Sequence, residues 1–371
     1  MKIVHLLASP GPGGAESLVR DLAIEHVSSG HEVEVFFFSS AKDVGNSPDY
    51  EAVLLDTMND AGVTSTILGH RTRTNALVGS SKLGKLLRMR GPDVLHIHLQ
   101  YGLLLRLALS GRRMATVYTH HTDHLKFGVR TFGLLTSRVE HCIAISSTIE
   151  GLLRAHTRAP VTMIRNAVAA RSPKRRRDGG LKLTVLSVGR LYPDKGYRTL
   201  IEAASMLGAK RPDLAKQIQF MIAGEGPQRA ELEEAIQAAG LQGQVILLGL
   251  RQDVPDLIAS AQLYLMTSRW EGLPISLIEA AQGGLPIIAT NVGGCSEVVR
   301  HGVNGYLVPP ENPDAIAEYL IELADKPETR KRMGKNSLLI AEEFSIVRAA
   351  TEHLRVYEES LFSRRNSGYR E

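Results

Sequence analysis

Short apolar runs alternate along the first half of the chain with longer segments in which apolar residues recur at helical spacing. In the segment 15–30, Leu18 and Leu22 lie one helical turn apart, and Gly30 follows the last turn, which predicts a helix ended by glycine. The apolar runs, which we expect to be strands, are 2–9, 31–40, 93–99, 114–120, 141–146 and 161–166. Strands that are apolar throughout and alternate with helices are typical of a parallel sheet covered on both faces.

This alternation is interrupted once and then resumes. At 169–180 the chain has a proline, four consecutive basic residues and two glycines, a composition typical of a linker. A second series of apolar runs follows at 181–189, 216–224, 243–249, 261–268 and 284–290, and from Asn312 the pattern is helical to the end. We therefore predict an α/β protein of two Rossmann-like doubly wound domains that face a central cleft. The expected bounds are 1–170 for the N-terminal domain, 171–180 for the linker and 181–345 for the C-terminal domain.

Composition indicates the class of protein, its ligands and its location in the cell, and it leaves the predicted fold class unchanged. The 371 residues are 43% hydrophobic and 22% charged, as in globular proteins, and the net charge of +5 suits phosphate-bearing ligands or an anionic surface. Cys142 and Cys295 form neither a disulfide framework nor a zinc spacing. No apolar run reaches the roughly 18 residues of a membrane span, and the first residues do not form a signal peptide. We expect a cytoplasmic protein whose membrane contact is at most peripheral.

A glycine loop, "GPGGAE" at Gly11–Glu16, follows the first expected strand and opens a helix. Glycines let a backbone approach a ligand closely, and a helix N-terminus favours an anion. The loop is not a dinucleotide fingerprint, because Glu16 stands where a third glycine is required and no acidic residue ends the second strand. A nicotinamide site is therefore not expected, whereas a ligand-facing loop and a plain strand-to-helix turn both stay open.

Histidines gather at or just after expected strand ends of the first domain: His96, His98, His120, His121 and His124. Because His96 and His98 are two residues apart on a strand, they share one face. A metal site is disfavoured, since the histidines lack the carboxylate and spacing pattern of a zinc site. The segment "THHTDH" at 119–124 instead suits hydrogen bonding to hydroxyl groups and movement of a proton.

Two cations follow the first strand of the second domain. In "SVGRLYPDKGY", Arg190 offers a planar fork for phosphate oxygens and Lys195 a compact charge. The segment is not a Walker A loop, because a glycine follows the lysine. The turn Gly224–Gly226, after the next strand, is expected at the same rim.

Two glutamates flank the start of the helix expected in "LPISLIEAAQGG". Glu271 precedes it, and Glu279 lies about one turn inside it among apolar neighbours. An acidic residue in a first turn gains about 0.3–1 kcal/mol from the helix dipole, but a buried carboxylate without partners costs more. We therefore expect a polar partner for Glu279, such as the vicinal hydroxyls of ribose. With free amides at Gly293–Gly294, these groups predict a diphosphate bound without metal.

The order of these motifs resembles the large retaining glycosyltransferase family four, which has the two-domain GT-B fold. The matching patterns are GG-A-E, T-x-H, V-G-R-L…K-G, G-E-G-P, E-x7-E and V-G-G, and the resemblance covers nearly the whole chain. It implies transfer of a sugar from a nucleotide diphosphate donor, such as a UDP- or GDP-sugar, with retention and with no metal or other cofactor. It also implies that 346–371 is a terminal helix that returns to the N-terminal domain. One departure is Asn166-Ala167, where the family reads Asn-Gly.

The resemblance assigns roles by position. His121 and Glu271 are the expected catalytic residues. The expected donor-binding residues are Gly13, Gly14, Arg190, Lys195, Leu250, Arg251, Leu273, Pro274, Ile275 and Glu279. In the family pattern Arg190 and Lys195 hold the diphosphate, Glu279 holds ribose and Glu271 faces the donor sugar.

The acceptor is not indicated by any motif, and a glycan, a lipid-linked or a small-molecule acceptor would fit, as in polysaccharide or lipopolysaccharide biosynthesis. Between residues 71 and 90 lie basic residues (Arg71, Arg73, Lys82, Lys85, Arg88 and Arg90) and leucines (Leu77, Leu83, Leu86 and Leu87). This segment predicts either a basic amphipathic helix that contacts anionic lipid or an ordinary solvated helix.

Other classes of function compete with the transferase. A nucleotide-sugar epimerase shares the fold, and a catalytically inactive transferase-like protein would bind without turnover. Nucleic-acid binding is disfavoured, because the basic residues are scattered and not interleaved with aromatic ones. The sequence does not indicate an oligomeric state.

Overall fold

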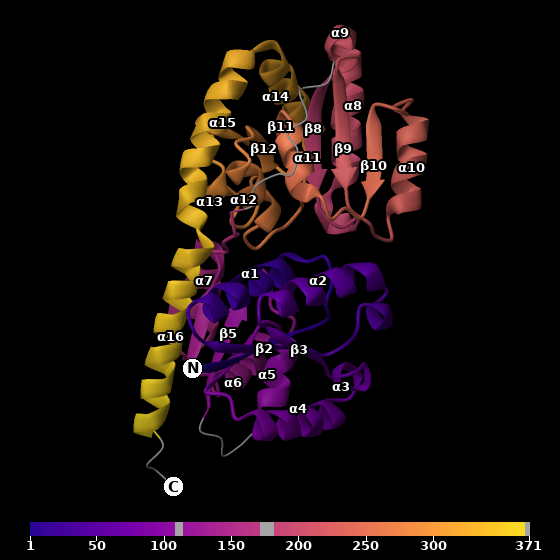
Figure 1. Ribbon diagram of the computed structural model, residues 1–371. Coiled ribbons are helices and arrows are strands. Elements are labelled where there is room, and N and C mark those ends of the chain that lie inside the picture. Colours follow the sequence, from indigo (N-terminus) through magenta and orange to yellow (C-terminus); the bar gives the residue numbers. More distant parts are fainter. Residues whose placement is uncertain (108–113, 171–181, 368–371) are drawn as a thin grey trace. The chain divides into compact units, whose positions relative to one another are not determined.

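The computed structural model describes residues 1–107, 114–170 and 182–367. The chain forms two compact units: unit 1 comprises Met1–Ala169 together with Ile346–Glu371, and unit 2 comprises Ala170–Ser345. The C-terminal helix therefore belongs to the same unit as the N-terminus (Figure 1). The expected linker, 171–180, lies outside the described residues.

Unit 1 is built on a seven-stranded parallel sheet. Its strands are β1 (Lys2–Leu7), β2 (Glu32–Phe37), β3 (Thr64–Ile67), β4 (Val94–Ile97), β5 (Ala115–His120), β6 (His141–Ala144) and β7 (Val161–Met163). Their spatial order is β3-β2-β1-β4-β5-β6-β7, so the winding direction reverses between β1 and β4. Ligands of doubly wound sheets bind off the carboxyl ends of the strands at such a reversal.

Helices cover both faces of this sheet, with α1 and α2 on one side and α4 and α5 on the other (Figure 1). The helices of unit 1 are α1 (Gly14–Ser28), η1 (Lys42–Val44), α2 (Pro48–Asp60), α3 (Arg71–Thr74), α4 (Ala76–Arg90), α5 (Gln100–Leu107), α6 (Val129–Thr136), α7 (Ser147–His156) and α16 (Ile346–Ser367). The terminal helix α16 packs against α1 and β5. It therefore covers the same face of the sheet as α1.

Unit 2 repeats this plan with a six-stranded parallel sheet. Its strands are β8 (Leu183–Val188), β9 (Ile218–Ala223), β10 (Val245–Gly249), β11 (Leu263–Met266), β12 (Ile287–Thr290) and β13 (Gly305–Val308). The spatial order β10-β9-β8-β11-β12-β13 places the reversal between β8 and β11. Phe220 and Leu265 of this sheet are fully buried, and burial of such a side chain contributes about 1.5–3 kcal/mol.

The helices of unit 2 follow its strands in alternation. They are η2 (Pro193–Lys195), α8 (Tyr197–Lys210), α9 (Pro212–Ala215), α10 (Arg229–Ala238), α11 (Val254–Ser260), α12 (Ile275–Gln282), α13 (Cys295–Val298), α14 (Pro313–Asp325), α15 (Pro327–Ala341) and η3 (Glu342–Phe344). Two parallel α/β sheets of Rossmann type confirm the predicted fold class. Among the described residues, no helix has the length and apolar character needed to cross a membrane.

The apolar pattern missed two strands, β3 and β13. The residues of β3 are Thr, Ser, Thr and Ile, and they are exposed or half-buried, because an edge strand needs no apolar run. The β13 strand begins at Gly305, where a Cβ would lie 1.9 Å from Ile287 O. The close approach of the two backbones therefore requires glycine here, where a strand would usually have a branched residue. The helical pattern after Asn312 is correct but is divided into α14, α15 and α16.

Candidate functional site

The carboxyl ends of β8 and β11 bring a lysine and a glutamate of unit 2 together. Lys195 follows β8, Glu271 follows β11, and Lys195 Nζ lies 2.6 Å from Glu271 Oε1. Asp194 Oδ2 is farther from the same Nζ, at 3.9 Å. The lysine and glutamate side chains are only 19% and 11% exposed, so solvent screens this ion pair less than it would a surface pair.

The loop that carries Lys195 is fastened to the segment after β11. Gly196 has a φ of +64°, and a Cβ at this position would lie 2.1 Å from Thr267 O; both features require glycine. Thr267 Oγ1 donates a hydrogen bond to Lys195 O at 3.0 Å, and Arg269 N donates to Asp194 O at 2.8 Å. These contacts fix the position of the lysine relative to the glutamate loop.

Glu271 is held from two further sides. Ser268 Oγ donates to Glu271 Oε1 at 2.7 Å, so that one carboxylate oxygen has two donors. The turn after β12 packs against the backbone of the same residue, because a Cβ on Gly293 would lie 1.8 Å from Glu271 O. Gly294 N also donates to Gly272 O at 2.7 Å. The loops after β11 and β12 therefore form one packed edge around this carboxylate.

Arg190 is the exposed cation of the site. Its guanidinium carbon lies 4.8 Å from the centre of the Tyr192 ring, a cation–π arrangement that restrains the side chain. Among the residues that the structure describes, no carboxylate lies within ion-pair distance of Arg190. Its charge is therefore available to an anionic ligand, whereas that of Lys195 is already paired.

The turn Gly224–Gly226 after β9 completes the rim beside β8. A Cβ on Gly224 would lie 1.9 Å from Gly189 O, so glycine is needed for the two loops to meet. Leu191 N donates to Glu225 O at 2.9 Å, and Gln228 N donates to Leu191 O at 3.1 Å. The expected tight turn is thus a support for the Arg190 loop.

Helix α12 begins next to Glu271. Leu273 and Ile275 are buried, and Pro274 is the residue that caps the helix N-terminus. First-turn amides of a helix have no intrahelical acceptor, so this N-terminus can receive an anion. Binding of the diphosphate by the backbone of these three residues stays a prediction.

Glu279 is less buried than its apolar neighbours suggest. Its side chain is half-buried and shares one edge of α12 with Ser276 and Gln282, which are three residues away on either side. Glu279 also interacts with another group of the chain. The helix can therefore accommodate this carboxylate without a ligand, and burial alone does not argue for ribose.

The expected base-binding pair follows β10. Leu250 is half-buried, and Arg251 is exposed and makes two hydrogen bonds of 2.7 and 2.6 Å to the carboxylate of Asp253. Gly224 N donates to Gly249 O at 2.8 Å, which places this segment beside the glycine turn. The guanidinium of Arg251 is already bonded to Asp253. Of the two residues, Leu250 is therefore the one that can contact a base without breaking a side-chain hydrogen bond.

Gly13 and Gly14 lie in unit 1, at the start of α1. Gly13 is the N-cap, and a Cβ there would lie 2.1 Å from Glu16 Oε2. The first-turn glutamate thus folds back over the glycine. A phosphate that approached this helix end would meet a negative charge as well as the favourable helix dipole.

His121, directly after β5, is half-buried, and its Nε2 lies 3.1 Å from His98 Nδ1. His120 is buried instead, with its Nδ1 2.7 Å from Tyr118 Oη. Burial lowers the pKa of His121 to about 3 and that of His120 to about 4, so both rings are neutral near pH 7. Of the two, only His121 is accessible to a ligand.

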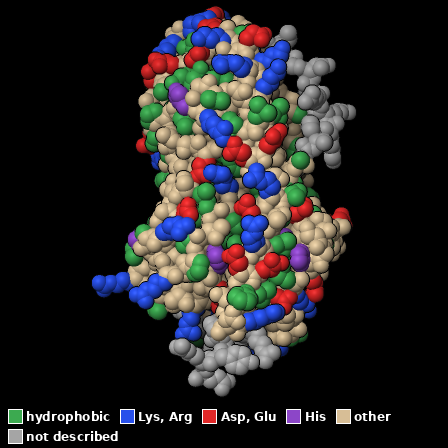
Figure 2. Space-filling view, turned by 90° about the vertical axis from the view of Figure 1, so that its left-hand side faces the viewer, with side chains coloured by type: hydrophobic (Ala, Val, Ile, Leu, Met, Phe, Trp, Pro, Cys, Tyr) green, Lys and Arg blue, Asp and Glu red, His purple; other side chains and the backbone are tan. Residues whose placement is uncertain are grey.

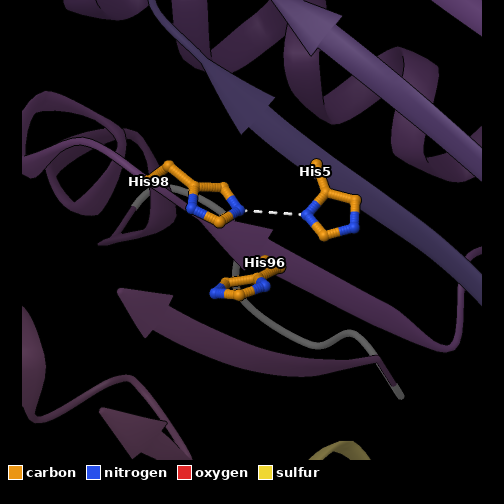
Figure 3. Close-up of side chains that lie close together, drawn as sticks. All are labelled: His5, His96 and His98. Atoms are coloured by element: carbon orange, nitrogen blue, oxygen red, sulfur yellow. Dashed lines mark hydrogen bonds between the residues drawn. The ribbon is translucent and has the colours of Figure 1, made fainter. Parts of the chain in front are cut away.

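Behind His121 lies a group of histidines that the sequence indicated only in part. His5 of β1 is paired in register with His96 of β4, and Figure 3 shows the His5 and His98 rings turned toward each other, with Nδ1 and Nε2 3.0 Å apart. His96 contacts Tyr357 Oη of α16 and Thr119 Oγ1, each at 2.7 Å. The face of the sheet under α1 and α16 is therefore lined by imidazoles.

His5, His96 and His98 offer nitrogens that all lie within 4.8 Å of one another, the one such group among the described residues. Imidazole nitrogens bind zinc at about 2.0–2.1 Å. In this structure, however, His5 and His98 share a hydrogen bond and both nitrogens of His96 have oxygen partners. A metal would have to replace these bonds, and a metal-free site stays a prediction.

The basic segment 71–90 is divided into α3 and α4 at Asn75. Leu83 and Leu87 pack in the core of unit 1, whereas Leu77 is 83% exposed. The expected basic helix is present as α4 but does not extend back to Arg71, and two of its four leucines are buried in the core. Contact of its exposed face with lipid stays a prediction. On the face shown in Figure 2, basic and acidic side chains are interspersed over the described residues.

Sequence reasoning missed His5, Ser268 and the partners on α16. A histidine within the otherwise apolar run "KIVHLL" was a usable signal for His5. No local pattern indicated His353 or Tyr357, which reach the same histidines from more than 200 residues away in the chain.

Comparisons with known proteins indicate the family to which the two units are similar. Residues 12–171 match the family model Glycosyltransferase Family 4, and residues 172–338 match Glycosyl transferases group 1. The chain is 35% identical over 178 residues to alpha-D-kanosaminyltransferase of Streptomyces kanamyceticus, covering 47% of this chain and 45% of that protein. The chain thus spans about half the length of this relative.

Two further similarities extend over more of the chain. It is 28% identical over 335 residues to the phosphatidylinositol N-acetylglucosaminyltransferase gpi3 subunit of Schizosaccharomyces pombe, covering 85% of this chain and 72% of that protein. Its fold is similar to that of Anabaena HepE in complex with UDP-glucose, with a TM-score of 0.79 and 24% identity over 98% of this chain and 100% of that one. Since both units match glycosyltransferase models, the chain is a GT-B glycosyltransferase of the family 4 kind.

Proposed function

We propose that this protein transfers a sugar from a nucleotide diphosphate donor, such as a UDP- or GDP-sugar, with retention and without a metal ion. The observation that carries the proposal is the Lys195–Glu271 ion pair at the reversal of the unit 2 sheet. Arg190 stands in the same loop as an exposed cation. Two cations beside a helix N-terminus supply the positive charge that a diphosphate needs.

Donor binding requires an exchange of partners. Diphosphate oxygens take the place of Glu271 beside Lys195, and the freed carboxylate turns to hydroxyls of the donor sugar. Because Ser268 also donates to Glu271, the carboxylate keeps one partner during the exchange. This coupling makes the catalytic glutamate available only when the donor is present.

The transfer step that the resemblance implies is a substitution on one face of the donor sugar. The bond between the anomeric carbon and the diphosphate oxygen breaks, and the electron pair goes to that oxygen. The acceptor hydroxyl forms the new bond on the same face, and its proton passes to the leaving diphosphate. Arg190 and Lys195 stabilise the charge that develops there.

The remaining assignments rest on the resemblance and are part of the proposal. Glu279 binds ribose, Leu250 and Arg251 lie beside the base, and the backbone of Leu273, Pro274 and Ile275 faces the diphosphate. In unit 1, Gly13 and Gly14 approach a phosphate, and His121 bonds the donor sugar. The neutral state of His121 is consistent with hydrogen bonding to a hydroxyl.

For the acceptor we propose a glycan or a lipid-linked sugar reached by peripheral membrane contact. Exposed Leu77 and Met89 lie on α4 with exposed Lys85 and Arg88, a combination that favours anionic lipid. Sedimentation with vesicles of phosphatidylglycerol, compared with vesicles of phosphatidylcholine, tests this contact. Binding to neither kind would remove the membrane from the proposal.

The experiment that tests the transfer is a thermal-shift screen of UDP-, GDP-, ADP- and CMP-sugars in buffer with EDTA, because a ligand of the folded state raises its melting temperature. The sugar that binds is then incubated with candidate acceptors, and NMR reports the anomeric configuration of the product. A product formed in EDTA with the donor's configuration supports the proposal. Release of an altered nucleotide-sugar without acceptor would favour the epimerase instead, and binding without turnover would favour an inactive protein.

A further inference from the structure

Three histidines of unit 1 form a continuous line of hydrogen bonds that ends at His121. His5 Nδ1 lies 3.0 Å from His98 Nε2, and His98 Nδ1 lies 3.1 Å from His121 Nε2. Along this line the His5 ring is fully buried, the His98 ring is 6% exposed and the His121 ring is half-buried. His98 uses both of its ring nitrogens in this line, so its tautomer determines that of His121.

Only two arrangements of protons satisfy both bonds. A neutral imidazole has one donor and one acceptor nitrogen, so the protons all point toward His121 or all point toward His5. Burial keeps the pKa of His98 well below its ordinary value and lowers that of His121 to about 3. Both rings are therefore neutral at physiological pH, and only these two arrangements need to be compared.

The buried end of the line favours one of them. Within the part of the chain that the structure describes, His5 Nε2 is buried and has no hydrogen-bond partner. If the protons pointed toward His5, this atom would be an unpaired N–H, and such buried orphan donors are rarer than unpaired acceptors. If they point toward His121, His5 Nε2 is an unprotonated acceptor. In that arrangement His98 Nδ1–H donates to His121 Nε2, and His121 carries its own proton on Nδ1.

We propose that His98, anchored by His5, is a positioning residue that holds His121 in the Nδ1–H tautomer, ready to donate a hydrogen bond to an oxygen of the donor. The role given to His121 rests on the proposed function. Among the described residues, His121 Nδ1 has no hydrogen bond, so this donor is free for a ligand. His96 lies beside the line but bonds to Thr119 and Tyr357, which leaves the line unbranched.

The tautomer is measured directly by two-dimensional NMR of the full chain labelled with ¹⁵N-histidine, with His121 assigned through His121→Gln. In the wild type we expect the Nδ1–H tautomer of His121. In His98→Leu we expect its loss, because Nε2 then has no donor. In His98→Gln we expect recovery, because the amide N–H can donate to Nε2. His353→Leu serves as the matched control, since His353 is also buried in the same group but, among the described residues, its ring bonds to Ala349 O and not to the line.

Activity supplies the second readout. If His121 donates to the reacting sugar, His98→Leu lowers kcat by about tenfold, the usual effect of one lost hydrogen bond to a polar group, with little change in donor KM. His98→Gln restores most of it, and His353→Leu leaves both constants near wild type. Equal losses in His98→Leu and His353→Leu would show a general packing effect and overturn the proposal.

The two readouts also separate this inference from the proposed function. An Nε2–H tautomer of His121 in the wild type, or no change in His98→Leu, overturns the positioning role whatever reaction the protein catalyses. The expected tautomers with no transfer from any donor would overturn the proposed function and leave the positioning of His121 standing.

Discussion

Lys195 Nζ lies 2.6 Å from Glu271 Oε1, although the two residues are 76 positions apart in the chain. The ion pair joins the loop after β8 to the loop after β11, and these strands are neighbours only because the sheet order reverses there. The cation proposed for the diphosphate and the carboxylate proposed for the sugar therefore neutralise each other when no donor is bound. Any ligand that uses one must release the other.

Replacement of Lys195 by methionine tests the first half of this relationship. Lys195→Met keeps the apolar stem and removes the charge, so the diphosphate loses a charge-assisted hydrogen bond. We expect the Kd of the donor nucleotide to rise about 10- to 100-fold, measured by isothermal titration calorimetry. Lys216→Met, an exposed lysine of the same unit, is the control. Equal affinity in Lys195→Met and wild type would contradict the diphosphate assignment.

Replacement of Glu271 by glutamine tests the other half. Glu271→Gln removes the charge that competes for Lys195, so we expect the free nucleotide diphosphate to bind at least as tightly as to wild type. Turnover should fall about tenfold or more, because the donor sugar loses a charged partner. Steady-state kinetics and calorimetry on one preparation separate the two effects, and Glu233→Gln on α10 controls for a lost surface charge. Weaker binding of the nucleotide together with normal turnover would reverse the assignment.

The fold and the unit 2 site could be predicted from the sequence for different reasons. The apolar runs and their alternation with helices predict both sheets, because a parallel strand buried on two faces admits few polar residues. Lys195 and Glu271 were predicted at strand ends, and the topology brings strand ends to one rim. Their direct pairing was not predicted, since neither residue type nor spacing states which side chains are partners when no ligand is present.

The histidine line of unit 1 was harder to predict. His98 and His121 were indicated by their positions after strands, but His5 lies inside a strand and is paired with His96 by sheet register. The contribution of α16 depends on a helix that follows the whole of unit 2 in the chain and packs on unit 1. The burial of Glu279 was overestimated, because one edge of α12 is half-exposed although its sequence is apolar.

Substitution of Gly196 should damage both stability and donor binding. Gly196→Ala meets a φ of +64° and places a Cβ 2.1 Å from Thr267 O, so the loop that carries Lys195 must move. We expect a loss of about 2 kcal/mol or more in the free energy of unfolding of unit 2 and weaker nucleotide binding.

Gly243 offers a matched control for this substitution. Its φ is +76°, but no atom of the described residues lies within 4 Å of a Cβ there, so Gly243→Ala measures the backbone strain alone, about 1 kcal/mol. Chemical denaturation of both variants separates strain from collision. Equal destabilisation of the two would show that the contact with Thr267 is not what fixes the lysine loop.

Acid should destabilise unit 1 through its buried histidines. Burial lowers the pKa of His26 to about 3 and that of His353 to about 4, and it lowers those of His5, His96 and His98 well below the ordinary value. In the unfolded chain these residues titrate near about 6.5. Because the folded pKa values are the lower ones, the unfolded state binds more protons as pH falls. The stability contribution is fully present above about pH 6.5 and is lost as pH falls from there toward about 4.

In this window, each of these histidines should lower the free energy of unfolding by about 1.4 kcal/mol for every unit by which the pH falls. The free energy of unfolding of unit 1, followed by circular dichroism in urea at pH 7, 6 and 5, measures the number of protons taken up as the slope against pH. His353→Leu removes one titrating group that lies between α16 and the sheet, so its slope should be smaller by about one proton. A slope near zero between pH 6.5 and 5 in the wild type would mean that these imidazoles are already charged in the folded state. The hydrogen-bond line to His121, which requires neutral rings, would then be wrong as well.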